Sequence, residues 1–423
     1  MIAWLLISFF VLLFLGVPIA MSLGLSAMGG ILGGGSTVTI AQRMFEGMNS
    51  FALLAIPLYT FAGFTMSKGG ISKRLMDFCY SIVGHIYGGL AHVNVLSSMI
   101  FAGISGSAVA DTAGVSGMFM PEMVRKGYSK NFTVAVTAIS STIGIIIPPS
   151  IPMVVIAGIC GISTGKLFLG GIIPGVLCGL AQMIVSYFMA KKEGVPKEPG
   201  HFTIGPVLHG LWESWPALLM PIIIVGTITM GIVSPTEAGV IAVVYGLFAG
   251  GIIYRELKWE DIKFAFAETV RTSGRIFIVI GAAKLYTVML TTAGFDKWVA
   301  KTMLGFSTNP TVILIVILLI FFIVTMFMES IATLTLFMPI LYPIALGVGI
   351  NPIVLSVLIT VVIGVGLVTP PVGMCIYVAC DLMDVTVGEV FPTLVPFIAA
   401  TFVCIALMVA FPQLILLPTY LMA

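Results

Sequence analysis

The stretch Gly103-Ile-Ser-Gly-Ser-Ala-Val-Ala-Asp-Thr-Ala-Gly-Val-Ser-Gly117 decides the fold of this chain. It lies between two apolar runs, Leu90–Phe101 and Met118–Met123, and each is shorter than the about 20 residues that a membrane-spanning helix needs. Irregular backbone at membrane depth persists only where it is buried in protein or lines a cavity. The pattern therefore predicts a re-entrant hairpin over residues 90–123, which returns to the side it entered from and has an irregular tip of small residues.

The composition indicates a membrane protein with many spans. Of the 423 residues, 59% are hydrophobic and 9% are charged, whereas soluble domains carry about 25% charged residues. The apolar runs are long and show no sustained alternation typical of barrel strands, so we expect an all-α polytopic fold. The net charge of +2 does not indicate a nucleic-acid partner. The chain begins without a basic segment or a cleavage site, so Ile2–Leu15 is expected to be a retained helix.

The cysteines and histidines do not indicate a metal centre or a disulfide framework. The six cysteines are scattered through apolar segments without a CxxC spacing, and the four histidines lack the spacing of metal ligands. We therefore expect no organic cofactor.

The two halves of the chain resemble each other. Short motifs recur in the same order at offsets of about 220 residues, which indicates an internal duplication. The matched motifs are Gly16-Val17-Pro18-Ile19-Ala20 with Ile232-Val233-Ser234-Pro235-Thr236, Leu58-Tyr59-Thr60 with Leu285-Tyr286-Thr287, Phe119-Met120-Pro121 with Phe337-Met338-Pro339, Ile147-Pro148-Pro149 with Thr369-Pro370-Pro371, and residues 162–168 with residues 385–391.

Each half contains one predicted hairpin and one helix broken at two prolines. The second hairpin is expected over Thr311–Leu341, interrupted at Glu329–Thr335. The broken helices cover Asn131–Ile159 and Pro352–Ala379, with breaks at Pro148–Pro152 and Thr369–Gly373. Proline removes a backbone donor and frees a carbonyl one turn earlier. Broken helices in matching positions of two inverted repeats indicate a transporter binding site near the middle of the membrane.

The basic residues orient the two halves in opposite directions. Most lysines and arginines fall in loops that share one side of the membrane if the repeats are inverted, and the positive-inside rule makes that side cytoplasmic. These loops are residues 68–74, 125–130, 191–197 and 255–263, against Arg43, Lys166, Lys297 and Lys301 on the other side. We therefore expect two inverted-topology repeats, with hairpin 1 opening to the cytoplasm, hairpin 2 opening to the periplasm and both termini in the periplasm.

The predicted breaks carry oxygens that suit a small hard cation. Hydroxyls at the tips and carbonyls of unwound helices favour Na⁺, so each repeat is expected to supply one site. The first comprises Ser105, Ser107, Gly144 and Pro148, and the second comprises Ser330, Thr333, Gly366 and Thr369. Serine and glycine are also common packing residues in membrane helices, and proline pairs can be simple kinks, so these alternatives stay open.

The same breaks are expected to bind an anionic substrate, because half-helix N-termini favour negative charge. The candidates are Ser107, Asp111, Ser150 and Glu329. Asp111 and Glu329 are ionisable groups at apparent membrane depth, which by default indicates function. For Glu329 the alternative is a protonated or snorkelling carboxylate. Lys284 also lies in the middle of a span, where it can pair with a carboxylate or face a protein interface.

The chain resembles the large membrane subunit of TRAP (tripartite ATP-independent periplasmic) transporters over essentially its whole length. The resemblance rests on residues 103–114 and on Ile146-Ile147-Pro148-Pro149-Ser150, Ser234-Pro235-Thr236-Glu237-Ala238-Gly239 and Val368-Thr369-Pro370-Pro371-Val372-Gly373. It implies a Na⁺-coupled importer of organic acids, such as sialic acid or C4-dicarboxylates, in the bacterial inner membrane. It also implies two partners, a small membrane subunit of about four helices and a periplasmic substrate-binding protein.

The resemblance further implies an elevator mechanism, in which a transport domain slides against a scaffold. The corresponding division assigns scaffold and arm helices to residues 1–89 and 215–306, and transport-domain halves to residues 90–189 and 307–423. Residues 190–214 form the predicted cytoplasmic connection.

Other functions make different demands on the same residues. A stand-alone Na⁺/carboxylate symporter would work without a binding protein. A channel would need a continuous pore, whereas hairpins entering from opposite faces favour alternating access. An intramembrane enzyme would use Asp111, Glu329, Asp381 or Asp384 as acid and base, but enzymes gather such groups into one site, and here they are spread over both halves.

Overall fold

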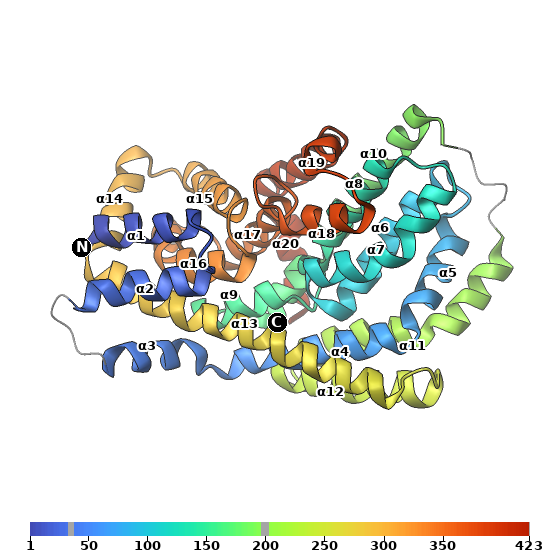
Figure 1. Cartoon of the computed structure of the whole chain (residues 1–423), viewed down its shortest axis with the longest axis horizontal. Helices are drawn as coiled ribbons and strands as arrows, with labels where there is room; N and C mark the ends of the chain where they lie inside the picture. The colour runs from blue at the N-terminus through green and yellow to red at the C-terminus, as the bar shows by residue number, and fades with distance from the viewer. Residues whose placement is uncertain (33–37, 196–202, 423) are drawn as a thin grey trace.

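The computed structural model describes residues 1–32, 38–195 and 203–422, and every regular element within these residues is a helix. The predicted all-α class is therefore confirmed (Figure 1). Among the described residues, seven helices are long and apolar enough to cross a membrane by length and composition. Part of the predicted connection over 190–214, residues 196–202, lies outside the described residues, as do Gly33, Gly34 and Gly35.

In the first half of the chain, the described residues form ten α-helices and two 3₁₀ turns. They are α1 (Ile2–Phe14), α2 (Ile19–Leu32), α3 (Val38–Met48), η1 (Phe51–Leu54), α4 (Ala55–Lys68), α5 (Ile71–Val83), α6 (Gly89–Ser105), α7 (Ala108–Arg125), α8 (Lys130–Ser141), η2 (Thr142–Ile145), α9 (Ile151–Cys160) and α10 (Thr164–Glu193).

The second half follows a similar order. Its elements are α11 (Ile204–Thr229), α12 (Pro235–Phe248), the π-helical turn η3 (Ala249–Ile253), α13 (Trp259–Thr292), α14 (Phe295–Phe306), α15 (Pro310–Thr325), α16 (Ser330–Gly347), α17 (Pro352–Gly366), α18 (Met374–Met383), α19 (Val387–Ala410), α20 (Gln413–Leu416) and the 3₁₀ turn η4 (Leu417–Met422).

Both hairpins form, but their irregular tips are shorter than the sequence predicted. In the first, only Gly106 and Ser107 interrupt the helical backbone, so the expectation of an irregular stretch over residues 103–117 is wrong. Gly106 ends α6 with a φ of 63°, which glycine adopts without steric cost, and Ser107 caps α7 by accepting a bond from the Ala110 N–H. The small residues that follow continue the helix.

The second tip is displaced from its predicted position. Residues 326–329 separate α15 from α16, and α16 already begins at Ser330, so the expected interruption over Glu329–Thr335 is wrong. The reason is a cap: the Glu329 carboxylate accepts bonds from the Ile331 and Ala332 N–H groups at 2.8 and 3.3 Å. A carboxylate in this position stabilises the start of a helix.

The two proline breaks lie where the sequence predicted them. Pro148 and Pro149 separate η2 from α9, and Pro370 and Pro371 separate α17 from α18. Both Pro–Pro bonds are cis.

Each half-helix that follows a break packs against the hairpin of the opposite half of the chain. Helix α9 packs against α16 of the second hairpin, and α18 packs against α7 of the first (Figure 1). The two tyrosines of the repeated Leu-Tyr-Thr motif also form hydrogen bonds with the opposite half of the chain. Tyr59 on α4 donates to the Pro235 carbonyl at 2.8 Å, and Tyr286 on α13 donates to the Leu5 carbonyl at 2.9 Å. Neither half of the chain therefore forms its interior contacts alone.

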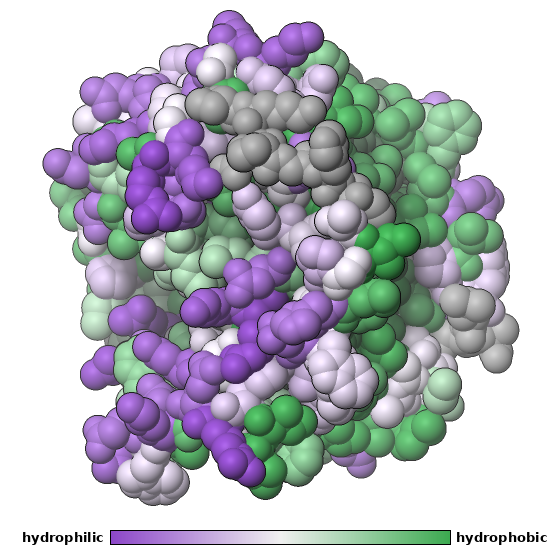
Figure 2. All heavy atoms as spheres, turned by 90° about the vertical axis from the view of Figure 1, so that its right-hand side faces the viewer, coloured by the Kyte–Doolittle hydropathy of each residue, from purple (hydrophilic) through white to green (hydrophobic). Residues whose placement is uncertain are grey.

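Several loops that the basic residues assigned to one side lie next to each other. Arg74 pairs with Glu256 at 2.7 Å, and the Ser129 hydroxyl donates to Glu193 at 2.9 Å. Figure 2 looks onto the right-hand end of Figure 1 and shows hydrophilic residues gathered over one side of that face, beside a hydrophobic strip. The grouping agrees with the predicted loop pairing. The side of the membrane that this end faces stays a prediction.

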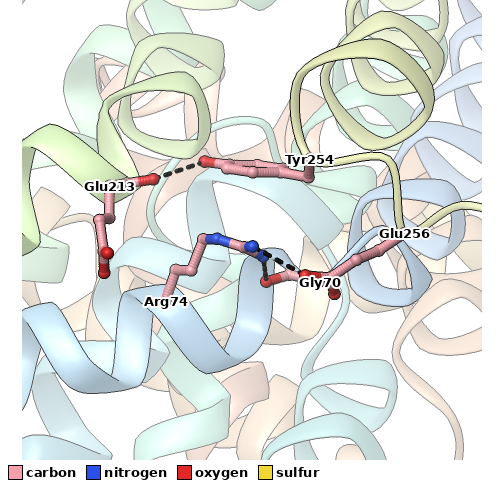
Figure 3. A network of polar contacts seen from close by, with 5 residues as sticks. All are labelled: Gly70, Arg74, Glu213, Tyr254 and Glu256. Atoms are coloured by element: carbon pink, nitrogen blue, oxygen red, sulfur yellow. Dashed lines mark hydrogen bonds and ion pairs between the residues drawn. The ribbon is translucent and has the colours of Figure 1, made fainter.

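Arg74 anchors the amphipathic helix α5 to the second half of the chain (Figure 3). Its guanidinium pairs with Glu256, donates to the Gly70 carbonyl at 2.8 Å and lies 4.2 Å from the ring centroid of Tyr254. The Tyr254 hydroxyl donates to the Glu213 carbonyl on α11 at 3.0 Å, and the Arg74 carbonyl accepts a bond from Ser214 at 2.9 Å. The Arg74 side chain thus joins the start of α5 to the turn after η3, while its backbone carbonyl and the Tyr254 hydroxyl add the links to α11.

We predict that Arg74→Ala destabilises the detergent-solubilised protein by about 1–2 kcal/mol, because a half-exposed ion pair and a cation–π contact are lost together. The thermal midpoint should fall by about 2–4 °C. The matched control is Arg125→Ala, which removes an ion pair with Glu122 on the same helix from an arginine side chain that is 74% exposed. It should change the midpoint by no more than about 1 °C. Equal falls for the two variants would contradict the anchoring role.

Candidate functional site

The tip of the first hairpin is bonded directly to the first proline break. The Ile151 N–H donates to the Gly106 carbonyl at 3.2 Å. A side-chain carbon on Gly106 would lie 2.7 Å from the Pro149 carbonyl oxygen, so only glycine allows the two irregular segments this close. The prediction that hairpin 1 and the first broken helix converge is confirmed.

Asp111 is the central side chain of this junction. It lies in the first turn of α7 and is 1% exposed. One carboxylate oxygen, Oδ1, accepts a bond from the Ser105 hydroxyl. The other, Oδ2, has no hydrogen-bond partner in the described part of the chain. A charged group this deeply buried is costly unless a counter-charge or a proton compensates it.

Gly144 has no side chain and so leaves room for this free oxygen. A side-chain carbon on Gly144 would collide with Asp111 Oδ2 and would lie 3.5 Å from the Ser107 carbonyl oxygen. The Asp111 carboxylate, the Ser105 hydroxyl and the Ser107 carbonyl therefore lie close together between α7 and η2. Such oxygens are the ligands that hard cations prefer.

The structure thus brings together most of the predicted first cation site and adds Asp111 to it. Ser105, Ser107 and Gly144 all contribute to the junction. The Pro148 carbonyl oxygen lies instead near Gly103 on α6, 3.7 Å from the position of a side-chain carbon on that glycine. Ser150 takes a local role. Its hydroxyl donates to the Ile145 carbonyl at 2.5 Å and accepts from the Met153 N–H at 3.3 Å, so it caps α9.

The second hairpin meets the second break through a matching backbone bond. The Val372 N–H donates to the Met326 carbonyl at 2.9 Å. A side-chain carbon on Gly366 would lie 2.6 Å from Thr325 Cβ at the end of α15. The Thr369 hydroxyl donates to the Val365 carbonyl at 2.7 Å. The convergence predicted for the second half is therefore confirmed as well.

The other residues predicted for the second site belong to the capping turn of α16. The Ser330 hydroxyl donates to the Glu329 carboxylate at 2.7 Å, and the Thr333 hydroxyl donates to the Glu329 carbonyl at 3.0 Å. The close approaches to Gly366 come instead from Thr325 and Phe322 of α15. The role of Ser330 and Thr333 as cation ligands stays a prediction, and so does substrate binding by Glu329.

Thr325 and Met326 are the junction residues that reasoning from sequence missed. The repeat itself contained the signal. Aligning Phe119-Met120-Pro121 with Phe337-Met338-Pro339 pairs Ser107 with Thr325 and Asp111 with Glu329. In this register, residues 108–111 form the first turn of α7, whereas their counterparts 326–329 are not helical. An unwound turn could not be read from residue types alone.

The helical segments that precede the two breaks also touch each other. A side-chain carbon on Gly364 of α17 would lie 3.3 Å from Thr142 Cβ and 3.5 Å from the Thr142 carbonyl oxygen in η2. Within the described residues, no group of three or more His, Cys, Asp or Glu side chains could hold a metal ion. The oxygens at the junctions come instead from hydroxyl groups, backbone carbonyls and single carboxylates.

Two hairpins and two broken helices that cross-pack in an apolar helical chain define a membrane transporter of the broken-helix class. The fold matches the crystal structure of the Alcanivorax borkumensis YdaH transporter with a TM-score of 0.59 and 13% sequence identity, over 89% of this chain and 88% of that one. At this identity the likeness concerns the fold alone.

The family model described as the tripartite ATP-independent periplasmic transporter, DctM component, matches residues 6–414, and the chain belongs to this family. The sialic acid TRAP transporter large permease protein SiaM of Vibrio cholerae is 35% identical over 408 residues, which cover 96% of this chain and 95% of that protein. The C4-dicarboxylate large permease protein DctM of Pseudomonas aeruginosa is 35% identical, covering 91% of this chain and 90% of its own.

A longer relative is the isethionate TRAP transporter permease protein DctMQ of Oleidesulfovibrio alaskensis. It is 37% identical over 393 residues, which cover 92% of this chain but 62% of that protein. The family expected from the sequence motifs is therefore confirmed, and the chain is a multi-pass membrane protein related to transporter permeases.

We predict that Gly144→Ala destabilises the protein by about 1–3 kcal/mol, because the added methyl group overpacks the junction at Asp111. The control is Gly114→Ala on α7, where a side-chain carbon would meet nothing within 4 Å. That change should be neutral or stabilising by up to about 1 kcal/mol, since alanine is the better helix former. Thermal unfolding in detergent measures both effects.

A double-mutant cycle tests the cause. In the Asp111→Ala background, Gly144→Ala should cost less than in the parent, because the oxygen that it collides with is gone. Equal costs in the two backgrounds would contradict the proposed contact.

Proposed function

We propose that this chain is the large permease subunit of a Na⁺-coupled importer of a small organic acid. The observation that carries the proposal is the buried Asp111 oxygen, which has no hydrogen-bond partner among the residues that the structure describes and faces Gly144 where hairpin tip and broken helix meet. Relatives named for sialic acid and C4-dicarboxylate support the substrate class. Membership of a family of transporter permeases favours transport over the enzyme alternative.

We propose one Na⁺ site at each junction. In the first, Asp111, Ser105 and Ser107 bind the ion through side-chain oxygens, with Gly144 and Pro148 contributing carbonyls. In the second, Thr369 and Gly366 act with Ser330 and Thr333 of α16. An ion in the first site would compensate the Asp111 charge and hold α7 against η2, so it would order the hairpin tip before substrate binds.

Binding of Na⁺ before substrate would couple substrate uptake to Na⁺. The substrate is an acid, and its proposed contacts near the tips include Ser107, Ser150 and two carboxylates, Asp111 and Glu329. Like charges repel strongly in a medium of low dielectric constant. Na⁺ bound beside each carboxylate would remove that repulsion, so substrate affinity would depend on Na⁺.

We further propose an elevator mechanism with the division given by the repeats. Residues 1–89 and 215–306 form the scaffold and arms, and residues 90–189 and 307–423 form the moving part. The contacts that such a motion must break involve small residues: a side-chain carbon on Gly63 of α4 would lie 3.2 Å from Ser105 Cα, and one on Gly103 would lie 2.5 Å from Pro221 Cγ on α11. Because glycine has no side chain to interlock with the facing helix, contacts of this kind would allow the two domains to slide past each other.

The family supports the remaining assignments. A small membrane subunit and a periplasmic substrate-binding protein complete the transporter. The chain lies in the bacterial inner membrane, and we propose that both of its termini are periplasmic.

We predict that uptake by the protein, reconstituted with its partners in liposomes, requires an inward Na⁺ gradient. The double variant Ser107→Ala/Thr369→Ala should raise the Na⁺ concentration for half-maximal uptake about tenfold or more, the effect of losing about 1.4 kcal/mol of ion binding. Radiolabelled acid uptake at varied Na⁺ measures this. Unchanged uptake in choline buffer would refute the coupling, and uptake without a binding protein would favour a stand-alone symporter.

A cross-link tests the motion. Gly63 and Ser105 are placed for a disulfide, because a side-chain carbon on Gly63 would lie 3.8 Å from Ser105 Cβ, the mean Cβ–Cβ separation across disulfides of about 3.8 Å. Oxidised Gly63→Cys/Ser105→Cys protein should lose uptake, and reduction should restore it to the level of Ser105→Cys alone. Full uptake by the quantitatively cross-linked protein would exclude sliding between α4 and hairpin 1.

A further inference from the structure

A cavity lined by both apolar and polar side chains lies outside the two hairpin tips. Its volume is about 190 Å³, and its walls come from α3, η1, α9, α13 and α16. The polar residues among its lining are Glu46, Ser50, Lys284, Thr287 and Thr335. Nothing in the proposed Na⁺ or substrate sites uses these side chains.

Lys284 is the positively charged side chain of the lining, which also contains the carboxylate of Glu46. It lies near the end of the long helix α13, where a side-chain carbon on Gly47 would be 2.6 Å from Lys284 Cβ, so glycine lets α3 hold the start of the lysine side chain in place. In the described part of the chain no carboxylate forms an ion pair with Lys284. The charged group that shares the lining, Glu46, pairs with Arg43 at 2.8 Å. Glu46 is therefore engaged with Arg43, and Lys284 has no direct ion pair within the described residues.

Two hydroxyl groups share the lining of the cavity with Lys284. Thr287 is three residues after Lys284 on the same helix face, it is buried, and its hydroxyl has no hydrogen-bond partner within the described residues. Ser50 Oγ lies 3.7 Å from the position of a side-chain carbon on Gly158 of α9. The missing side chain at Gly158 keeps open the space in front of Ser50. An ammonium group with two adjacent hydroxyl donors matches the acceptor oxygens of a carboxylate.

We propose that this cavity binds the carboxylate of a small organic acid, with Lys284 as its counter-charge and Thr287 and Ser50 as hydrogen-bond donors. A volume of about 190 Å³ exceeds the space of a few waters at about 30 Å³ each, and it is below the 300 Å³ of drug-sized pockets. It suits a C4-sized acid or the acidic end of a larger one. Binding does not require Na⁺, because none of the ligands belongs to the junctions.

The site would bridge parts of the protein that the repeats assign to different domains. Thr287 and Lys284 lie on α13, Ser50 lies just before η1, and Thr335 lies on α16 of the second hairpin. An acid bound here would contact hairpin 2 on the helix behind its tip. The cavity would thus hold a second molecule of acid outside the junctions, in contact with both the scaffold and the hairpin.

The test is thermal stability of the purified chain in dodecylmaltoside and Na⁺-free choline buffer, titrated with succinate. Succinate should raise the unfolding midpoint of the parent by at least 2 °C at saturation. Lys284→Gln should weaken the apparent affinity at least tenfold, and Thr287→Val should weaken it severalfold without removing the charge. Lys301→Gln, which removes an exposed lysine on α14 outside the cavity, should leave the titration unchanged.

Three outcomes would overturn the proposal: no succinate shift in the parent, an equal shift in Lys284→Gln, or an equal loss in Lys301→Gln. A titration with phosphatidylglycerol in the same micelles tests a lipid phosphate as the occupant. Stabilisation by the lipid but not by succinate, lost in Lys284→Gln, would also overturn it. If Lys284→Gln fails to fold, Thr287→Val and Gly158→Val, which fills the space before Ser50, decide the matter.

The succinate shift in choline buffer should persist in Ser107→Ala/Thr369→Ala. Failure of Na⁺ coupling and failure of this second site are therefore distinguishable in one set of measurements.

Discussion

Two backbone hydrogen bonds, from Ile151 to Gly106 and from Val372 to Met326, hold the centre of this molecule together. Backbone N–H and C=O groups at membrane depth cannot form hydrogen bonds with water, so they must find partners within the protein. Here a hairpin tip and a broken helix, each irregular and each incompletely bonded by itself, satisfy one another. This constraint explains why each repeat contains both elements and why the two must lie side by side.

Glycine residues at the junctions allow the hairpin tips and the broken helices to approach each other closely. Gly106 permits contact with the Pro149 carbonyl, Gly144 leaves room beside Asp111, and Gly366 accommodates Thr325. A methyl group at any of the three would displace a neighbour. The close approach places a carboxylate oxygen, a hydroxyl and a carbonyl near one another, and we propose that a cation bound there compensates the charge of Asp111. Crossing of α9 and α18 into the opposite half then links the two junctions mechanically.

The sequence predicted these elements unequally. The proline breaks, the pairing of hairpins with broken helices and the convergence of Ser105, Ser107 and Gly144 follow from local residue types and from the duplication. The tips were predicted as too long because small residues were interpreted as irregular backbone. Packed within protein, Asp111 to Gly117 form a regular helix, and a Glu329 cap starts α16 at Ser330, directly after the cap and not after Thr335 as expected. Caps depend on which N–H groups are left free, and this is known only once the helix ends are placed.

The sequence by itself determined the helical membrane class, the duplicated order of elements, the family and most of the residues at the first junction, because hydrophobicity, proline and glycine act locally and the motifs recur. Only the tertiary structure decided that Asp111 faces Gly144 with one free oxygen, that Thr325 and Met326 replace α16 residues in the contacts of the second break, and that Lys284 shares a cavity with Thr287 and Ser50. These relations join residues far apart in the chain, and their geometry is set by how closely helices from opposite halves approach.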